Sequence, residues 1–107
     1  MDFDCLDVES INGFDWDNGN IYKNEDTHGL NYKKIEEVFF NEPLLVIEDF
    51  AHSELECRCI AFGIDNSNRK IVVIFTVRDS KIRVISAREM TKKEKKFYEN
   101  NKNNPYL

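Results

Sequence analysis

The hydrophobic pattern of the chain changes near residue 44 from a helical period to an alternation of two, and this change limits the fold more than any other feature. From Leu44 onward, the period changes to two, and four short segments are rich in Ile, Val and Phe. Such segments are typical of β-strands. We predict strands at about residues 44–49, 57–64, 70–78 and 81–87.

Two polar segments separate the last three predicted strands. Asp65-Asn66-Ser67-Asn68 and Asp79-Ser80 contain the residue types that favour tight turns. The last three strands should therefore form an antiparallel meander. The segment 71–77 is apolar on both faces, which predicts a central strand covered on both sides.

The two predicted helices that precede the strands have clear ends. Asp17 can cap a polar helix over about 18–27, and Gly29 is a natural stop for it. Asn31 can cap a second helix through about Phe40, in which the apolar residues repeat at helical spacing.

A third helix is predicted after the strands. Thr91 and Glu94 form a capping box that opens a helix through about Asn100. Helices followed by a run of strands favour an α+β fold, with N-terminal helices, an antiparallel four-stranded sheet and a C-terminal helix.

The length of 107 residues predicts one domain. We assign residues 14–100 to it, residues 1–13 to an acidic N-terminal arm, which is either mobile or forms a short edge strand, and residues 101–107 to a C-terminal tail. No apolar run approaches the ~18 residues of a membrane span, and the first residues lack the pattern of a signal peptide. We therefore expect a cytoplasmic protein.

Charge is distributed unevenly along the chain. Residues 1–57 carry 3 basic and 15 acidic side chains, whereas residues 58–107 carry 12 basic and 5 acidic ones. The formal net charge of −5 argues against strong unspecific binding of nucleic acid. Any attraction of a polyanion must come from a local group of cations.

Cations gather near the end of the last predicted strand. Strict alternation places Lys81 and Arg83 on one face and Arg88 on the opposite, otherwise buried face. A cation held at the rim of a core is partly desolvated, which strengthens its interaction with a phosphate. Lys92 and Lys93 would extend this positive surface onto the last helix.

Each of these cations also has a structural alternative. Arg88 can cap neighbouring carbonyls or pair with Glu94, and a run of lysines on a helix is most often a solvated face.

The segment His52, Glu56 and Arg58 contains the groups that phosphoryl chemistry needs. RNA cleavage requires a base for the ribose 2′-hydroxyl, a cation for the phosphate oxygens and an acid for the leaving oxygen. We predict that His52 or Glu56 is the base and that Arg58 and Arg88 hold the phosphate. The alternative is that Glu56 and Arg58 form a surface ion pair.

The other histidine, His28, comes at a helix C-terminus before Gly29, where the helix dipole favours its charged form. A histidine in this position is more often structural than catalytic. We predict no metal or other cofactor, because Cys57 and Cys59 would need two more ligands at a suitable spacing and the sequence offers none.

These pieces together resemble the BrnT family of toxins from bacterial type II toxin–antitoxin systems. The resemblance runs from about residue 14 to residue 99, and the motifs that carry it occur in order and at the expected spacing. They are Phe14-Asp15-Trp16-Asp17, Asn24, His28-Gly29, Glu37-Val38-Phe39-Phe40, Asp49, His52-Ser53, Glu56-x-Arg58, Phe62-Gly63, Arg83-x-Ile85-Ser86-Ala87-Arg88, Thr91, Glu94 and Tyr98.

The resemblance implies a RelE-like ribonuclease fold and metal-independent cleavage of RNA that arrests translation and growth. It also implies neutralisation by a BrnA-type ribbon-helix-helix antitoxin, through which alone the complex would bind operator DNA. The residues that it places in or beside the RNA site are His28, His52, Glu56, Arg58, Arg83 and Arg88. We expect His52, Glu56, Arg58 and Arg88 to be catalytic, and His28, Lys81, Arg83, Lys92 and Lys93 to bind RNA.

Two positions depart from the family pattern. Members usually have lysine where this chain has Asn20 and Thr27, so two cations are missing from the expected phosphate surface. The alternative function is therefore a catalytically weakened homologue, which binds its antitoxin and acts within a DNA-binding autorepressor complex.

Overall fold

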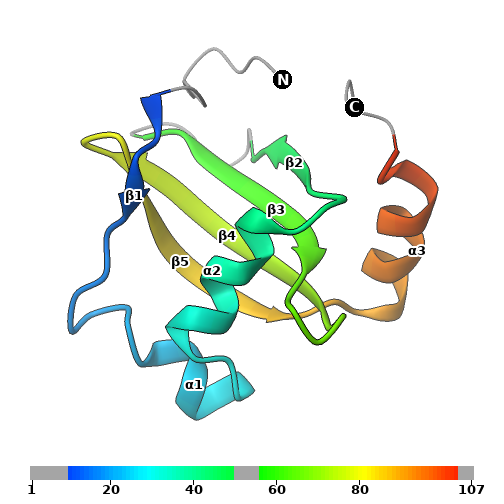
Figure 1. The fold of residues 1–107 in the computed structure, drawn as a ribbon, viewed down its shortest axis with the longest axis horizontal. Helices are drawn as coiled ribbons and strands as arrows, with labels where there is room; N and C mark the ends of the chain where they lie inside the picture. Colours follow the sequence, from blue (N-terminus) through cyan, green and yellow to red (C-terminus); the bar gives the residue numbers. More distant parts are fainter. Residues whose placement is uncertain (1–9, 50–55, 104–107) are drawn as a thin grey trace.

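A five-stranded mixed sheet with the strand order β1-β5-β4-β3-β2 organises the protein (Figure 1). The computed structural model describes residues 10–49 and 56–103. The strands are β1 (Gly13–Phe14), β2 (Leu45–Glu48), β3 (Arg58–Ile64), β4 (Lys70–Arg78) and β5 (Lys81–Glu89). The helices are α1 (Lys23–His28), α2 (Tyr32–Phe40) and α3 (Lys92–Asn101).

The predicted α+β class is confirmed, and β2 to β5 match the four predicted strands in antiparallel order. The prediction of a purely antiparallel four-stranded sheet is wrong, because β1 pairs in parallel with β5 as a fifth strand. The backbone N–H of Asn12 donates to the carbonyl of Ser80, and that of Asp15 donates to the carbonyl of Ile82. The N···O distance is 2.8 Å in both bonds. A two-residue strand has no periodicity, so the hydrophobic pattern could not reveal it.

The first helix is shorter than predicted. It begins at Lys23 instead of residue 18, and Tyr22 at its N-cap makes no side-chain cap. Asp17 does not cap it, because the Asp17 carboxylate accepts from the backbone N–H of Gly19 and so stabilises a turn. The predicted stop is confirmed, since Gly29 has a left-handed backbone with φ of 66°.

The capping predictions for the other two helices are confirmed. Asn31 accepts the N–H of Lys34 at the start of α2. Thr91 and Glu94 form the complete capping box at the start of α3. The turn at Asp79 and Ser80 is also confirmed, and both residues have the positive φ angles that a two-residue hairpin requires.

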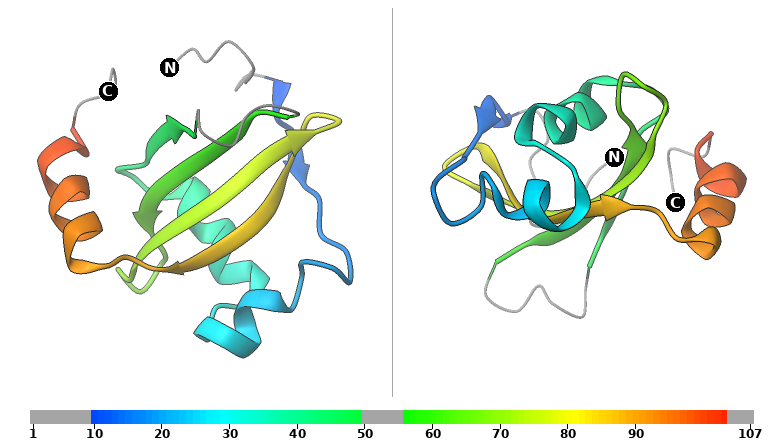
Figure 2. Two further views of the ribbon diagram at one scale, coloured as in Figure 1. Left: turned by 180° about the vertical axis from the view of Figure 1, so that it is seen from behind. Right: turned by 90° about the horizontal axis from the view of Figure 1, so that it is seen from below.

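The two faces of the sheet have different covers. Helices α1 and α2 lie on one face, called here the helix face, and α3 stands beside the sheet and packs on the other, called the second face (Figure 2). Buried side chains of the helix-face core include Leu30, Ile35, Val38, Ile71 and Phe75. The smaller core of the second face consists of Leu45, Phe62, Val72, Met90 and Tyr98.

Strand β5 contains one extra residue, Ile85, relative to β4. Ile74 pairs with Ser86 and Phe75 pairs with Val84, so the register shifts by one between them. A β-bulge of this kind reverses the inward and outward alternation beyond it. The sequence prediction that Arg88 faces away from Arg83 is therefore wrong, and both side chains belong to the second face.

Side chains from residues 20–24 occupy the outer edge of β5 beyond β1. The amide of Asn20 donates to the carbonyl of Val84, the ammonium of Lys23 donates to that of Ile85, and Asn24 accepts the N–H of Ala87. These bonds satisfy backbone groups that would otherwise remain open on an edge strand. They also fix the segment before α1 against β5.

Glycine at position 63 allows α2 to approach the sheet closely. A Cβ atom at Gly63 would lie 2.9 Å from Cγ1 of Val38 and 3.3 Å from Cδ1 of Leu44. We therefore expect Gly63→Ala to lower the free energy of unfolding by roughly 1–3 kcal/mol, because the packed helix must shift. Urea denaturation measures this value. Gly13→Ala is the control, since its Cβ would meet nothing within 4 Å; equal losses in the two variants would contradict the packing argument.

Several predictions concern residues that the structure does not describe. The arm, apart from residues 10–13, the end of the tail and His52 all lie outside the described ranges, so the division into arm, domain and tail stays a prediction. Within those ranges, no helix has both the length and the apolar character needed to cross a membrane.

Candidate functional site

Basic side chains of the β4–β5 hairpin lie near a basic side chain at the start of β3. In the sheet register Arg58 lies opposite Thr76, and Thr76 lies opposite Arg83. Neighbouring strands are about 4.8 Å apart, so these three residues form a row across the second face that is about 10 Å long. A second row beside it contains Arg78 opposite Lys81.

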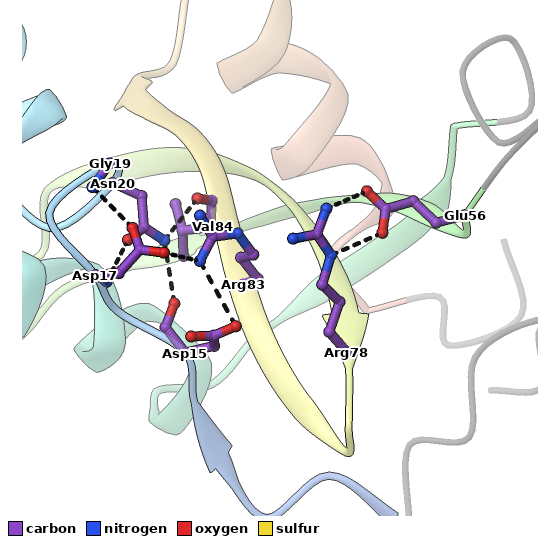
Figure 3. Close-up of polar contacts among 8 residues, drawn as sticks. All are labelled: Asp15, Asp17, Gly19, Asn20, Glu56, Arg78, Arg83 and Val84. Carbon is purple, nitrogen blue, oxygen red and sulfur yellow. Dashed lines mark hydrogen bonds and ion pairs between the residues drawn. The ribbon is translucent and has the colours of Figure 1, made fainter.

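Glu56 completes the second row. Its carboxylate accepts two hydrogen bonds of 3.0 Å from Nε and one terminal nitrogen of Arg78 (Figure 3). This fork geometry holds both side chains in a defined orientation. We call the set Glu56, Arg58, Thr76, Arg78, Lys81 and Arg83 the hairpin cluster.

The Glu56 carboxylate is a poor proton acceptor in this arrangement. Hydrogen bonds from Arg78 lower the pKa of Glu56, and the charges of Arg78 and Arg58 lower it further. The prediction that Glu56 pairs with Arg58 as a surface ion pair missed the main partner, because the cross-strand neighbour Arg78 provides a bidentate contact. The geometry suits Glu56 as a group that orients Arg78.

Arg83 is held by two carboxylates from the segment after β1. One terminal nitrogen, Nη1, lies 2.9 Å from Asp17 Oδ2 and 3.6 Å from Asp15 Oδ2 (Figure 3). The same segment packs Phe14 and Trp16 against the helix-face core. Residues 14–17 thus alternate as an extended chain does, with aromatic rings toward α2 and carboxylates toward Arg83.

Arg88 lies on the same face as Arg83 but near the opposite end of β5. Its guanidinium donates to both carboxylate oxygens of Glu94, with N···O distances of 2.6 and 2.9 Å. This pair with Glu94 was the structural alternative stated for Arg88. Hydrogen bonding to Arg88 lowers the pKa of Glu94, and the backbone N–H of Thr91 lowers it further. This pair joins the end of β5 to the start of α3.

The Arg88–Glu94 pair should make stability depend on pH. Because the pKa of Glu94 is lowered from its ordinary value of 4.5 on folding, the pair stabilises the fold fully above pH 4.5 and progressively less as the pH falls through the folded pKa. We expect Glu94→Gln, which keeps the capping geometry, to cost about 1 kcal/mol at neutral pH and less at pH 3. Urea unfolding of both proteins across this range measures the difference, and a difference independent of pH would contradict the assignment.

The structure does not bring the histidines into the hairpin cluster. His28 is exposed at the end of α1, and its carbonyl accepts a 3.3 Å hydrogen bond from Arg69, which precedes β4. Arg69 and Arg78 lie at opposite ends of β4, and nine residues of strand span about 30 Å. His52 falls outside the described residues.

The lysines of α3 form a separate group. Lys92 and Lys93 are exposed in the first turn, close in sequence to Arg88 and Glu94. They therefore extend the positive surface at the far end of β5 and do not join the hairpin cluster.

Sequence reasoning missed three residues that contact the predicted ones. Arg78 is the last residue of β4 and was not singled out, yet it is the partner of Glu56. Asp15 was noted only within the family motif and Asp17 as a helix cap, and both prove to be partners of Arg83. The available signal was the hairpin turn at Asp79, because counting back from it places Arg78 opposite Lys81.

Asn20 stands at one of the two positions where the resemblance led us to expect lysine. Asn20 is only 5% exposed; its amide donates to the carbonyls of Asp15 and Val84, and its carbonyl accepts the N–H of Asp17. A buried residue with three hydrogen bonds is part of the structure of the loop, so in this chain the side chain at position 20 is not on the surface. The side chain of Thr27 is outside what the structure describes.

The described residues provide little for metal or thiol chemistry. Within residues 10–49 and 56–103, no three His, Cys, Asp or Glu side chains are grouped as a metal site requires. Burial raises the pKa of the Cys59 thiol to about 11, so this group is protonated at neutral pH and is a weak nucleophile.

Fold and site together define a small α+β protein with a group of cations on one face of its sheet, a surface suited to polyanions. Residues 16–94 match the family model of the ribonuclease toxin BrnT of type II toxin–antitoxin systems. The chain belongs to the BrnT family, as its sequence motifs predicted, and this membership implies an RNA target and an antitoxin partner. No curated protein matches the chain.

Proposed function

We propose that the protein is an endoribonuclease toxin of the cytoplasm, and that the hairpin cluster is where it binds the RNA backbone. The observation that supports this most is the row of Arg58, Thr76 and Arg83 with Arg78 and Lys81 beside it. Guanidinium groups bind phosphate oxygens through paired hydrogen bonds, and they stabilise the charge that develops on a phosphate during cleavage.

In this proposal the cations provide most of the catalysis. Arg58 and Arg78 neutralise the phosphate, Glu56 orients Arg78, and Arg83 and Lys81 hold the neighbouring backbone. His52 remains the proposed base, since the lowered pKa of Glu56 makes that carboxylate less suitable. Arg88, His28, Lys92 and Lys93 lie away from the cluster and are proposed only as contacts for the rest of the RNA.

Metal independence, arrest of translation and neutralisation by a BrnA-like antitoxin complete the proposal. The cations of the cluster can supply the positive charge that a metal ion supplies in other nucleases. An antitoxin that covers the same face with carboxylates would exclude RNA, and it would be the component that binds operator DNA.

Induced expression and a cleavage assay test the proposal. Wild-type protein should stop growth on induction, and purified protein should cleave single-stranded RNA in the presence of excess EDTA. The toxicity of a variant with both Arg58→Ala and Arg88→Ala should be strongly reduced. Intact RNA at high wild-type concentration, together with normal growth, would reject the proposal.

A specific observation also supports the second candidate, a weakened homologue that serves as an antitoxin-binding module. Cations of the second face are opposed by carboxylates of the chain itself, as in the pairs of Arg78 with Glu56, Arg83 with Asp17 and Arg88 with Glu94. Such pairs weaken attraction of RNA. Under this candidate the purified chain leaves RNA intact, but it still forms a complex with its antitoxin.

A further inference from the structure

We propose that Asp15 and Asp17 occupy the place of an RNA phosphate at Arg83, so that the segment carrying them competes with RNA for this cation. The inference rests on the proposed function, because it concerns access to the same face. It assigns to the start of the domain a regulatory role, in which a contact within the chain limits RNA binding.

The contact has the chemistry of a phosphate contact. Nη1 of Arg83 lies 2.9 Å from an oxygen of Asp17 and 3.6 Å from an oxygen of Asp15. Carboxylate and phosphate oxygens are equivalent acceptors for a guanidinium group. A phosphate can therefore take the position of either carboxylate without any change at Arg83.

Exposure shows which partner an incoming ligand meets first. The side chain of Arg83 is 20% exposed, whereas that of Asp17 is 53% exposed and that of Asp15 is 37% exposed. The carboxylates thus lie on the solvent side of the pair. A phosphodiester approaching Arg83 meets negative charge first, which is unfavourable until the carboxylates turn away.

The backbone beneath these carboxylates is fixed, so only side chains need to move. Asn20 accepts the N–H of Asp17 over 2.7 Å and donates to the carbonyls of Asp15 and Val84 (Figure 3). The segment therefore keeps its place on β5 while the carboxylates rotate, although rotation of the Asp17 side chain also breaks the hydrogen bond that Oδ1 accepts from the N–H of Gly19. Displacement by RNA is a local exchange of partners and requires no unfolding of the loop.

The local charge makes this competition important. Among the described residues of this region, Arg58, Arg78, Lys81 and Arg83 bring four positive charges, and Asp15, Asp17, Asp49, Glu56 and Asp79 bring five negative ones. The formal net charge of the whole chain is −5, so long-range attraction does not compensate. Removing the two aspartate charges should change RNA affinity strongly.

Affinity for an uncleavable RNA tests the inference. Fluorescence anisotropy at low salt measures binding of a short single-stranded 2′-O-methyl RNA, which has no free 2′-hydroxyl to attack. We expect the double variant D15N/D17N to bind about tenfold more tightly than wild type. For this variant the slope of log affinity against log salt concentration should be more negative by about 0.7. This is the value for one more phosphate contact on a single strand.

The fold should survive these substitutions. Asparagine keeps the Oδ1 atom through which Asp17 accepts the N–H of Gly19, so the turn retains its hydrogen bond. Thermal melting of each variant verifies this before binding is compared.

Two controls separate a local contact from total charge. The variant E89Q/E99Q also removes two ion-paired carboxylates, but their partners Arg69 and Lys70 lie at the other end of the sheet. We expect its affinity to change less than about threefold. Adding Arg83→Ala to D15N/D17N should abolish the gain, because the freed cation is then absent.

The outcomes distinguish the inference from the proposed function. Equal gains in D15N/D17N and E89Q/E99Q, or a gain that persists without Arg83, would overturn the inference. A wild-type protein that cleaves RNA while D15N/D17N binds no tighter would overturn the inference alone. Failure of every variant to bind, with RNA left intact by wild type, would overturn the proposed function and the inference together.

Discussion

Arg58→Ala should reduce RNA cleavage by roughly 100-fold to 1,000-fold, which is the usual loss when one preorganised group that stabilises transition-state charge is removed. Arg58 lies at the start of β3 on the second face, in the same row as Arg83 and near the Glu56–Arg78 pair. The other cation of this row, Arg83, lies two strands away from Arg58. Single-turnover cleavage of a defined RNA measures the effect.

Arg69→Ala is the matched control for this experiment. Arg69 carries the same charge and pairs with Glu89, but it lies beyond the far end of β4. Its removal should change cleavage less than about threefold, as expected of a screened distant charge. Equal losses in the two variants would mean that total charge decides activity. Arg58→Lys should recover only part of the rate, because an ammonium lacks the paired donors of a guanidinium.

Asn20→Ala should lower the free energy of unfolding by about 2–4 kcal/mol. The substitution removes three hydrogen bonds at a residue that is 5% exposed, and it leaves the carbonyls of Asp15 and Val84 and the N–H of Asp17 without this partner. Each buried polar group left unsatisfied costs about 1–3 kcal/mol. Urea denaturation followed by tryptophan fluorescence provides the measurement, since Trp16 lies in the same segment.

Asn18→Ala provides the comparison, because Asn18 is exposed and belongs to the same loop. Its effect should lie within about 0.5 kcal/mol of zero. If both substitutions cost the same, the loop is held by its general conformation and not by Asn20. Asn20→Ala should also loosen the contact of Asp17 with Arg83, so a change in RNA affinity would accompany the loss of stability.

Local rules predicted the parts of the fold that depend on neighbouring residues. Asn31 and the pair Thr91 and Glu94 cap their helices as expected, because capping involves positions only three residues apart. Gly29 ends α1, and the Asp79-Ser80 hairpin joins β4 to β5. The segments rich in Ile, Val and Phe identified β2 to β5, because each strand packs apolar residues on a core.

The errors arose where a distant partner changed a local preference. Asp17 is a good cap by residue type, but Gly19 and Arg83 take its carboxylate. Glu56 has Arg58 as its nearest cation in sequence, but Arg78 reaches it across the sheet with two hydrogen bonds. Such choices depend on register, and the register of a strand pair is set by the whole sheet.

The sequence predicted the types of residue in the candidate site better than their grouping. Glu56, Arg58, Lys81 and Arg83 meet in one place, whereas His28 and Arg88 are remote from it. The roles of all these residues stay predictions until cleavage is measured. Family membership itself was recognisable because ordered short motifs over most of the chain are specific together.

The extra residue in β5 has a consequence for comparing relatives. Arg83 and Arg88 are separated by an odd number of positions, and in a regular strand they would point to opposite sides; the insertion at Ile85 turns them to the same side. A homologue that lost one residue here would have to exchange its inner and outer side chains over the remainder of the strand. An alignment gap at this point would therefore be a sign of a redirected binding surface, even where every arginine is retained.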